Sequence, residues 1–385
     1  MRILVTTPSA WGHLQPMMPL VQALQHRGHE LRWATGADSC RTLEVAGVST
    51  IAAGVDQQTL LRPLSQLPPS VRQLPREVVP EVMFGQIFGG IAAPAMLRDL
   101  TPVVTRWAPD LVIHDAAEFA GPIIAASLGV RSVTKSFGML LPRERVIGAG
   151  HQVAGLWRSM GLDPPPFGGC YRDLYLDICP GSLQPSLPDY LGRRQELRPL
   201  SQDTTWSEPD TAELSWPPGF PDVYLTLGTV FPSASVLGRI VAAVADLGAG
   251  MLVTVGPRMD PADLGRQPPH VRVERYVPQS LVLPRCRVVV SHGGSGTAFA
   301  ALSHGVPQLL LPQGADQFLN ANAISRAGAG LQLRTETVDA EAIAGAVRRL
   351  LTEPGFSSAS ERLAVEISHM AGPDQVAEVL EGLPG

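Results

Sequence analysis

A glycine-rich turn in the second half of the chain has the composition of a phosphate-binding site. The run His292-Gly293-Gly294-Ser295-Gly296-Thr297 follows the apolar run 288–291 and precedes a segment with helical spacing. Glycines let backbone N–H groups approach an anion, and a helix N-terminus adds the positive end of its dipole. The absence of a following lysine and of G-x-G-x-x-G spacing excludes a P-loop and the dinucleotide fingerprint. The pattern predicts either a phosphate cradle of amides, hydroxyls and an imidazole, or a glycine turn without a ligand.

A carboxylate and an amide stand side by side further along the chain. Asp316 and Gln317 follow the predicted strand 308–311 and begin a helical segment. Ligands of open α/β sheets bind beyond the carboxyl ends of the strands, which is where this pair is placed. The two side chains suit several sugar hydroxyls. The structural alternative is a helix N-cap followed by a first-turn residue.

A histidine follows the first predicted strand, 3–7, at Gly12-His13. An imidazole exchanges a proton near neutral pH, so His13 is a candidate general base; a helix cap or a solvated surface residue is the alternative. A base of this kind is usually oriented by a carboxylate. Asp115 and Glu118 follow the strand 111–114 at the same edge and are the two candidates, although Asp115 also suits a helix N-cap. His114 is interpreted as a strand-end residue without a role.

Alternating strands and helices must position these groups. Strands are predicted over 3–7, 31–35, 111–114, 131–135, 223–227, 252–255, 271–276, 288–291 and 308–311, and helices over 14–26, 121–128, 235–245, 296–304, 317–327 and 340–351. This alternation is typical of parallel sheets with helices on both faces. A stretch rich in Pro, Gly and Ser, 180–221, separates two doubly wound α/β halves.

The predicted boundaries divide the chain into four parts. We expect an N-terminal domain over 1–205, a linker over 206–220, a second domain over 221–355 and C-terminal helices over 356–385. The stretch 54–97 is rich in proline and carries Met83, Phe84, Ile87, Phe88 and Met96. It is predicted to be either a packed irregular insertion or the wall of an apolar ligand pocket.

Composition excludes several classes of protein. The 385 residues carry a formal net charge of −5 and no strongly basic segment, which argues against a nucleic-acid partner. The longest uncharged stretch, 82–97, is too short for a membrane span, and the chain opens on a strand-like run, so a soluble cytoplasmic protein is expected. The four cysteines, Cys40, Cys170, Cys179 and Cys286, form no C-x-x-C pair and are expected to be buried free thiols.

Four segments together resemble the signature of family 1 glycosyltransferases, and more narrowly the bacterial enzymes that glycosylate antibiotics and other natural products. They are Arg275-Tyr276-Val277-Pro278-Gln279, 292–297, Gly305-Val306-Pro307 and Asp316-Gln317. The resemblance implies the GT-B fold, in which two Rossmann-like domains face each other across a cleft. It assigns the acceptor to the N-terminal domain and the nucleotide sugar to the C-terminal domain, and has the last helices cross back to the first domain.

The resemblance also implies roles in donor binding. Tyr276 matches the aromatic residue that stacks on the pyrimidine, and the Val277 backbone would contact the base edge. The pyrophosphate contacts match His292, Ser295, Gly296 and Thr297, in the turn that also contains Gly294, and a second phosphate-side hydroxyl matches Thr229. The pair that holds donor-sugar hydroxyls matches Asp316 and Gln317, and Gln279 ends the motif that begins with Arg275. Relatives that use ribose nucleotides often carry a glutamate where this chain has Ala300, so the sequence favours a dTDP-sugar over a UDP-sugar as donor.

On the acceptor side, Gly12-His13 matches the family's Gly-His-x-x-Pro element, with Pro16 in place. The resemblance makes His13 the base of an inverting, metal-independent transfer and Asp115 its partner, with Glu118 as the rival. An apolar, polyketide-like natural product is the expected acceptor. The residues expected to contact it are Trp11, Met83, Phe84, Phe88 and Phe137.

Two other functions share parts of this pattern. A GT-B sugar-nucleotide epimerase would use the same phosphate cradle, but it would not need an apolar acceptor pocket. A non-catalytic nucleotide-sugar-binding partner would bind the donor without turnover. Transfer to carbon instead of oxygen, a homodimer, and the auxiliary activator protein that some similar enzymes need are all compatible with the sequence.

Overall fold

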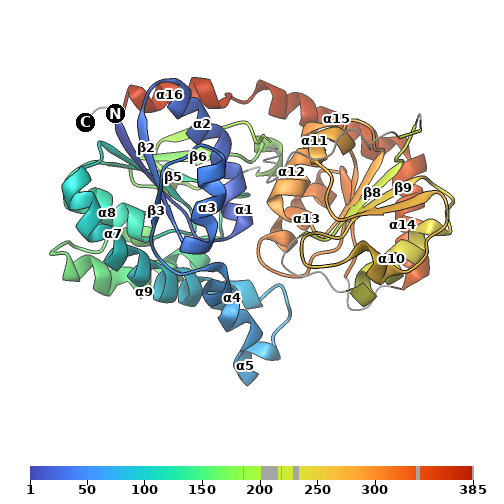
Figure 1. Cartoon of the computed structure of the whole chain (residues 1–385), viewed down its shortest axis with the longest axis horizontal. Helices are drawn as coiled ribbons and strands as arrows, with labels where there is room; N and C mark the ends of the chain where they lie inside the picture. The colour runs from blue at the N-terminus through green and yellow to red at the C-terminus, as the bar shows by residue number, and fades with distance from the viewer. Residues whose placement is uncertain (185, 201–215, 218, 229–233, 335–338, 384–385) are drawn as a thin grey trace. The chain divides into compact units, whose positions relative to one another are not determined.

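A computed structural model describes residues 1–184, 186–200, 216–217, 219–228, 234–334 and 339–383. Its contacts divide the chain into two units, each built on its own parallel sheet (Figure 1). The first unit comprises Met1–Cys179, Ser186–Arg198 and Met370–Gly385, and the second comprises Pro180–Pro185 and Pro199–His369. The two doubly wound α/β halves that the sequence predicts are therefore present.

The first sheet has seven parallel strands in the order β3-β2-β1-β4-β5-β6-β7. Their bounds are β1 (Arg2–Thr6), β2 (Glu30–Thr35), β3 (Thr50–Ala52), β4 (Leu111–Asp115), β5 (Arg131–Lys135), β6 (Leu174–Asp177) and β7 (Arg194–Glu196). Every residue of β4 is buried, which explains why its sequence lacks the two-fold alternation of a half-exposed strand. Because β1, β4 and β5 are neighbours that point the same way, their carboxyl ends bring Thr6, Asp115 and Lys135 to one edge of the sheet.

Helices cover this sheet and extend beyond it. Their bounds are α1 (Trp11–Leu14), η1 (Gln15–Met17), α2 (Met18–His26), α3 (Ala37–Val45), α4 (Gln57–Ser65), α5 (Pro69–Arg72), α6 (Val79–Phe84), η2 (Gly85–Ala92), α7 (Ala93–Trp107), α8 (Ala120–Leu128), α9 (Arg143–Ser159), η3 (Pro166–Gly169), η5 (Asp189–Leu191) and α16 (Pro373–Glu381). The main core packs α7, α8 and α9 against β4 through residues such as Leu100, Ile123 and Val153.

The stretch 54–97 is mostly helical, so the expectation of an irregular insertion is wrong. Pro69 and Pro80 lie in the first turns of α5 and α6, where a missing N–H leaves no helical bond unmade, whereas Pro63 lies inside α4 and Pro94 inside the continuous helix formed by α6, η2 and α7. The helical stretch Val79–Trp107 is long and apolar enough to cross a membrane by length and composition, because one 18-residue window of it has a mean hydropathy of 1.2. The uncharged stretch 82–97 lies within it. In this unit Met96 and Val104 are core residues packed with α8.

The middle of this long helix, η2, is a π-helix held close to α9. A Cβ atom at Gly85 would lie 3.0 Å from the backbone of Gly148, and one at Gly89 would lie 2.9 Å from the Ala149 carbonyl oxygen. Glycine at these two positions is what permits the close approach of the two backbones. One-turn π-helical segments occur often near functional sites.

The second sheet has six parallel strands in the order β10-β9-β8-β11-β12-β13. Its strands are β8 (Val223–Thr226), β9 (Met251–Thr254), β10 (Val271–Glu274), β11 (Val288–Ser291), β12 (Gln308–Leu310) and β13 (Gly330–Gln332). Its helices are η4 (Gly181–Leu183), α10 (Ala234–Ala245), η7 (Pro261–Leu264), α11 (Gln279–Val282), α12 (Ser295–Ser303), α13 (Gln317–Arg326), α14 (Ala340–Thr352) and α15 (Pro354–His369). The carboxyl ends of β11 and β12 lead toward the two predicted donor motifs.

The return of the chain to the first unit begins at Met370, later than the residue 356 expected from the sequence. Helix α15 belongs to the second unit, and only α16 packs in the first, against α2. Arg27, at the end of α2, forms ion pairs with Glu378 and Glu381 of α16. The expected linker 206–220 lies largely outside the described residues. All four cysteines are free and buried, as expected.

Two neighbouring glycines of η2 test the packing against α9. Gly89→Ala should cost about 1–3 kcal/mol, because its methyl group meets backbone that cannot move without displacing a helix. Gly90→Ala, whose nearest neighbour would be the Gln152 side chain at 3.5 Å, should be neutral or stabilising by about 0.4–1 kcal/mol. Urea unfolding of both variants measures the difference. Equal stabilities would show that the close approach to α9 is not real.

Candidate active site

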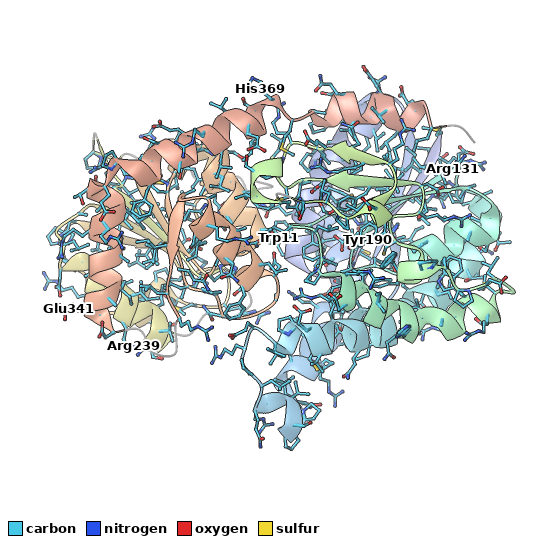
Figure 2. All side chains as sticks on the ribbon, turned by 180° about the vertical axis from the view of Figure 1, so that it is seen from behind. Trp11, Arg131, Tyr190, Arg239, Glu341 and His369 are labelled. Atoms are coloured by element: carbon cyan, nitrogen blue, oxygen red, sulfur yellow. The ribbon has the colours of Figure 1, made fainter. Side chains whose placement is uncertain are left out.

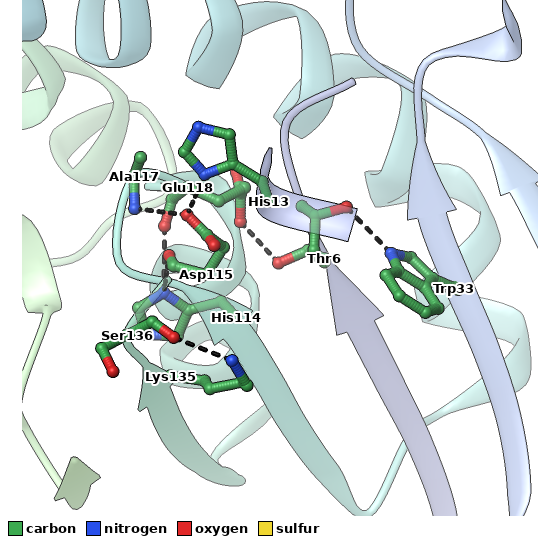
Figure 3. Close-up of polar contacts among 10 residues, drawn as sticks. Thr6, His13, Trp33, His114, Asp115, Ala117, Glu118, Lys135 and Ser136 are labelled. Carbon is green, nitrogen blue, oxygen red and sulfur yellow. Dashed lines mark hydrogen bonds and ion pairs between the residues drawn. The ribbon is translucent and has the colours of Figure 1, made fainter. Parts of the chain in front are cut away.

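The first unit pairs His13 with Asp115 at the carboxyl edge of its sheet (Figure 3). His13 lies in α1, just after β1, and its Nδ1 is 3.0 Å from Oδ1 of Asp115, the last residue of β4. The same Oδ1 accepts the backbone N–H of Ala117 at 2.8 Å. With Asp115 ionised, Nδ1 carries the proton, which leaves the lone pair on Nε2 free to accept another. The side chains of His13 and Asp115 are only 12% and 2% exposed, so water screens the pair little.

The carboxylate of Glu118, the other candidate partner of His13, is hydrogen-bonded to other groups. Its carboxylate accepts the Thr6 hydroxyl at 2.6 Å and the backbone N–H groups of Ala120 and Gly121 at 2.7 Å each. These contacts close the first turn of α8, so the helix-start role considered for Asp115 belongs to Glu118. Burial raises the pKa of Glu118, and the three donors oppose that effect.

His114 is structural, in agreement with its interpretation from sequence. Its ring is buried, and Nδ1 lies 3.0 Å from the carbonyl oxygens of both Asp115 and Glu118. Burial lowers the pKa of His114 to about 4, so the ring is neutral. Its Nδ1–H therefore donates to these carbonyls, and Nε2 accepts the hydroxyl of Thr134 at 2.9 Å. The contacts fix the turn that carries Asp115.

Two aromatic rings flank His13. The centroid of the Phe137 ring lies 4.4 Å from that of the imidazole, and the centroid of Phe88 lies 5.7 Å away. Phe84 is in the main core and packs on Phe88 with centroids 4.8 Å apart. Among the predicted acceptor contacts, the structure thus brings Phe88 and Phe137 to the base.

The other two predicted acceptor contacts lie differently. Met83 is 3% exposed and belongs to a small apolar cluster with Leu60, Val71 and Ile87. Trp11 is the first residue of α1, two positions before His13 (Figure 2). Met83 is therefore a core residue, and no measured contact in the described structure places it beside the imidazole.

In the second unit the glycine-rich turn leads straight into α12. Gly293 has a positive φ of 82° and Gly294 is the N-cap residue, with no side chain capping the helix. The N–H of Gly293 is already bonded to the Ser291 hydroxyl at 3.1 Å. The first turn of α12, which begins at Ser295, is therefore the part of the motif with donors for an anion.

His292 is enclosed between two glycines. A Cβ atom at Gly228 would lie 2.5 Å from its Cε1, and one at Gly294 would lie 2.6 Å from its Nε2. Its Nδ1 is buried and has no hydrogen-bond partner among the described residues. Burial lowers the pKa of His292 to about 4, against the attraction of Asp316, so the ring is neutral near pH 7. Thr229, the other predicted phosphate contact, lies outside the described residues.

Asp316 and Gln317 are held by hydrogen bonds that the sequence does not predict. Asp316 makes no side-chain cap on α13; its Oδ2 accepts the Ser295 hydroxyl at 2.5 Å. Oε1 of Gln317 accepts the N–H groups of Gln313 and Gly314 at 2.7 and 3.1 Å. Asp316 and Gln317 thus stand at the N-cap and in the first turn of α13, as the structural alternative predicted, but the Asp316 carboxylate bonds to the phosphate turn instead of capping the helix.

Asn320 is a residue of this site that sequence reasoning missed. It is 0% exposed, and its Nδ2 lies within 3.0 Å of the Gly293 carbonyl oxygen, the Ser295 hydroxyl and the Asp316 carboxylate. It thereby joins the turn, α12 and α13. The available signal was its rarity, since the chain has only two asparagines, Asn320 and Asn322.

The remaining donor residues surround the start of α12. Tyr276 is 54% exposed and presents a ring to solvent, whereas the side chain of Val277 is buried. Gln279 of α11 donates to the Thr297 hydroxyl at 3.0 Å. Ala300 lies in an apolar cluster with Val277, so a glutamate there would enter a core position.

Comparisons with known proteins identify the family. Models of the domains of erythromycin biosynthesis protein CIII-like proteins match the chain, the N-terminal domain over residues 22–186 and the C-terminal domain over residues 238–383. The chain belongs to this family of antibiotic glycosyltransferases. The elloramycin glycosyltransferase ElmGT of Streptomyces olivaceus is 33% identical to it, over 100% of this chain and 98% of the relative. The L-demethylnoviosyl transferase of Streptomyces niveus is also 33% identical, over 99% and 97%.

Solved structures agree with this assignment. The glycosyltransferase VinC in complex with dTDP matches with a TM-score of 0.80 and 27% identity, over 100% of this chain and 99% of VinC. The spinosyn rhamnosyltransferase SpnG complexed with thymidine diphosphate matches with a TM-score of 0.82 and 26% identity, over 99% and 100%. The protein is thus a glycosyltransferase of the GT-B fold, as its motifs predicted.

The two asparagines of α13 test how the turn is held. Asn320→Ala should lower the free energy of unfolding by about 1–3 kcal/mol, because buried acceptors lose their donor. Asn322→Ala removes an exposed amide from the same helix and should change it by less than about 0.5 kcal/mol. Chemical denaturation of the two variants gives the comparison. A similar effect of both substitutions would contradict a structural role for the Asn320 amide.

Proposed function

We propose that this glycosyltransferase transfers a sugar, typically a deoxysugar, from a dTDP-sugar to a hydroxyl of an apolar, polyketide-like natural product, with inversion at the anomeric carbon. The observation that carries the proposal is the His13–Asp115 pair flanked by Phe88 and Phe137. It combines a base whose Nε2 can accept a proton with rings that can pack on an apolar acceptor.

The chemical steps follow from this geometry. Nε2 of His13 removes the proton of the acceptor hydroxyl while that oxygen attacks the anomeric carbon. The bond from the anomeric carbon to the phosphate oxygen breaks on the opposite face, and the electron pair leaves with dTDP. Asp115 stabilises the imidazolium that forms, since its carboxylate already accepts the Nδ1 proton.

Donor binding is assigned to the second unit. The first turn of α12 and His292 would stabilise the diphosphate, and Asp316 and Gln317 would hold hydroxyls of the sugar. Tyr276 offers an exposed ring for stacking on the base. The preference for dTDP is supported by the dTDP complexes of VinC and SpnG and by a relative named TDP-daunosamine transferase, DnrS of Streptomyces peucetius.

We also propose that the leaving group departs without a metal ion. The donors at the turn are neutral amides, hydroxyls and an imidazole whose Nδ1 is unpartnered among the described residues. Such donors, fixed in place before the reaction, stabilise charge that develops on the leaving oxygen.

Loss of the His13 imidazole should separate chemistry from binding. His13→Ala should lower transfer to a hydroxyl acceptor ~10²–10⁴-fold, the range for removal of a general base, and leave dTDP affinity unchanged. His26→Ala, at the exposed end of α2, is the matched control. Product formation with a dTDP-sugar panel and calorimetric titration of dTDP measure both effects.

The result discriminates among the alternatives. Turnover within a few-fold of the wild type would exclude His13 as the base. Binding of dTDP by a wild type that transfers no sugar would favour the non-catalytic partner, and interconversion of the dTDP-sugar without an acceptor would favour the epimerase.

Binding of dTDP should cause His292 to take up a proton. Its pKa is about 4 in the free protein because desolvation of the half-buried ring disfavours the charged form, and a diphosphate beside it favours that form. The pKa therefore rises on binding, so at about pH 6 a proton is taken up. Calorimetric titration in two buffers of different ionisation enthalpy should show this uptake in the wild type and in Ser295→Ala, and less uptake in His292→Ala.

The same variants rank the diphosphate contacts. His292→Ala should weaken dTDP more than Ser295→Ala, because a charge-assisted bond is about twice as strong as a neutral one and the Ser295 hydroxyl already donates to Asp316. Turnover should survive EDTA. Equal proton uptake in all three proteins, or activity that EDTA abolishes and Mg²⁺ restores, would overturn this account of the leaving group.

A further inference from the structure

A lysine is buried beside the proposed catalytic pair, and the reaction described above makes no use of it. Lys135 is the last residue of β5 and the only lysine of the chain. It is 1% exposed and lies opposite Asp115 in the register of β5 with β4 (Figure 3). Because residues opposite each other on parallel strands project to the same face, its side chain leaves the sheet on the side of the Asp115 carboxylate.

The burial of this ammonium is costly. Among the described residues it has a single hydrogen-bond acceptor, the Ser136 carbonyl oxygen at 2.8 Å, although an ammonium can donate three hydrogen bonds. Burial lowers the pKa of Lys135 to about 8, while the charges of Asp115 and Asp177 raise it. The group therefore remains mostly protonated at neutral pH. A methionine would fill the same space without this cost, so packing does not explain the charge.

The other charged groups at this edge already have partners. Asp177, at the end of β6, forms an ion pair with Arg194 at 2.8 Å. The oxygens of Glu118 are bonded to Thr6 and the start of α8. Of the two carboxylates whose charges act on Lys135, Asp115 lies opposite it on the neighbouring strand, whereas Asp177 is paired with Arg194.

We propose that Lys135 is a positioning residue that keeps Asp115 ionised and so keeps the proton of His13 on Nδ1. This inference rests on the proposed role of His13 as the base. An ionised Asp115 accepts the Nδ1 proton and leaves Nε2 free for the acceptor hydroxyl. A protonated Asp115 would instead donate its own O–H to Nδ1, which places the imidazole proton on Nε2 and prevents it from accepting one.

Neutral and charged replacements of Lys135 give the test. Removing a positive charge makes neighbouring groups take up protons at higher pH, so in Lys135→Met the acidic limb of the kcat/KM profile should move up by about one pH unit. Lys135→Arg keeps the charge and should keep the limb in place. Arg194→Met removes a cation that is already paired with Asp177, and the limb should move much less. A purely structural lysine would lower kcat at every pH and move no limb.

A second readout needs neither donor nor acceptor. The His13 ring proton, assigned by its loss in His13→Gln, should titrate by NMR at a higher pH in Lys135→Met than in the wild type and in Lys135→Arg. In an Asp115→Asn background the same Lys135→Met change should move this midpoint much less. Lys135→Gln replaces the methionine variant if thermal unfolding shows that the latter does not fold.

The outcomes separate this inference from the proposed function. Unchanged midpoints and limbs in both neutral variants, or an equal shift in Arg194→Met, overturn the role of Lys135 even if His13 is the base. Shifted NMR midpoints in a protein without transferase activity on dTDP-sugars would uphold the electrostatic coupling and reject the proposed donor or acceptor.

Discussion

A carboxylate that is removed from water must be supplied with donors, and this requirement shapes the carboxyl edge of the first sheet. Asp115 is supplied by the His13 ring and by the turn that follows β4. Glu118 is supplied by Thr6 of β1 and by the start of α8. The ends of β1 and β4, helix α1 and helix α8 are therefore held in one arrangement by two buried carboxyl groups. The hydrogen bond between His13 and Asp115 also orients the imidazole.

The predicted donor site of the second unit differs in its electrostatic character. Around the start of α12 lie the Asp316 carboxylate and several hydrogen-bond donors: an uncapped helix terminus, hydroxyls, and a half-buried imidazole whose pKa is lowered to about 4. Glycines at positions 228 and 294 let the ring of His292 approach the backbone. The turn is fixed from behind by Asn320 and Asp316. An anion would meet donors that need little rearrangement, which is the condition under which such donors contribute most to catalysis.

Local patterns predicted the parts of the site that depend on a single strand end. The turn at 292–297 and His13 were found because glycine content and the strand-to-helix change are visible in a few consecutive residues. The family resemblance favoured Asp115 over Glu118, but local spacing could not decide between them, because the choice depends on which carboxylate projects toward a residue 102 positions away. Asn320 and Lys135 were missed for the same reason: each acts across neighbouring elements. The helices of 54–107 were hidden by their prolines, because some of these start a helix, such as Pro80, and others lie within one, such as Pro63 and Pro102.

The course of the chain between the two units has a consequence for synthesis on the ribosome. The first unit includes Met370–Gly385, so the helix that packs on α2 is translated after the whole of residues 199–369. At roughly 5–20 residues per second that interval lasts about 10–30 s. During it the surface of α2 that α16 will cover, with the Arg27 guanidinium, is open to water and to chaperones. The sheet of the second unit can therefore form before α16 joins the first unit. The N-terminal unit, whose synthesis begins first, completes its folding after the second unit.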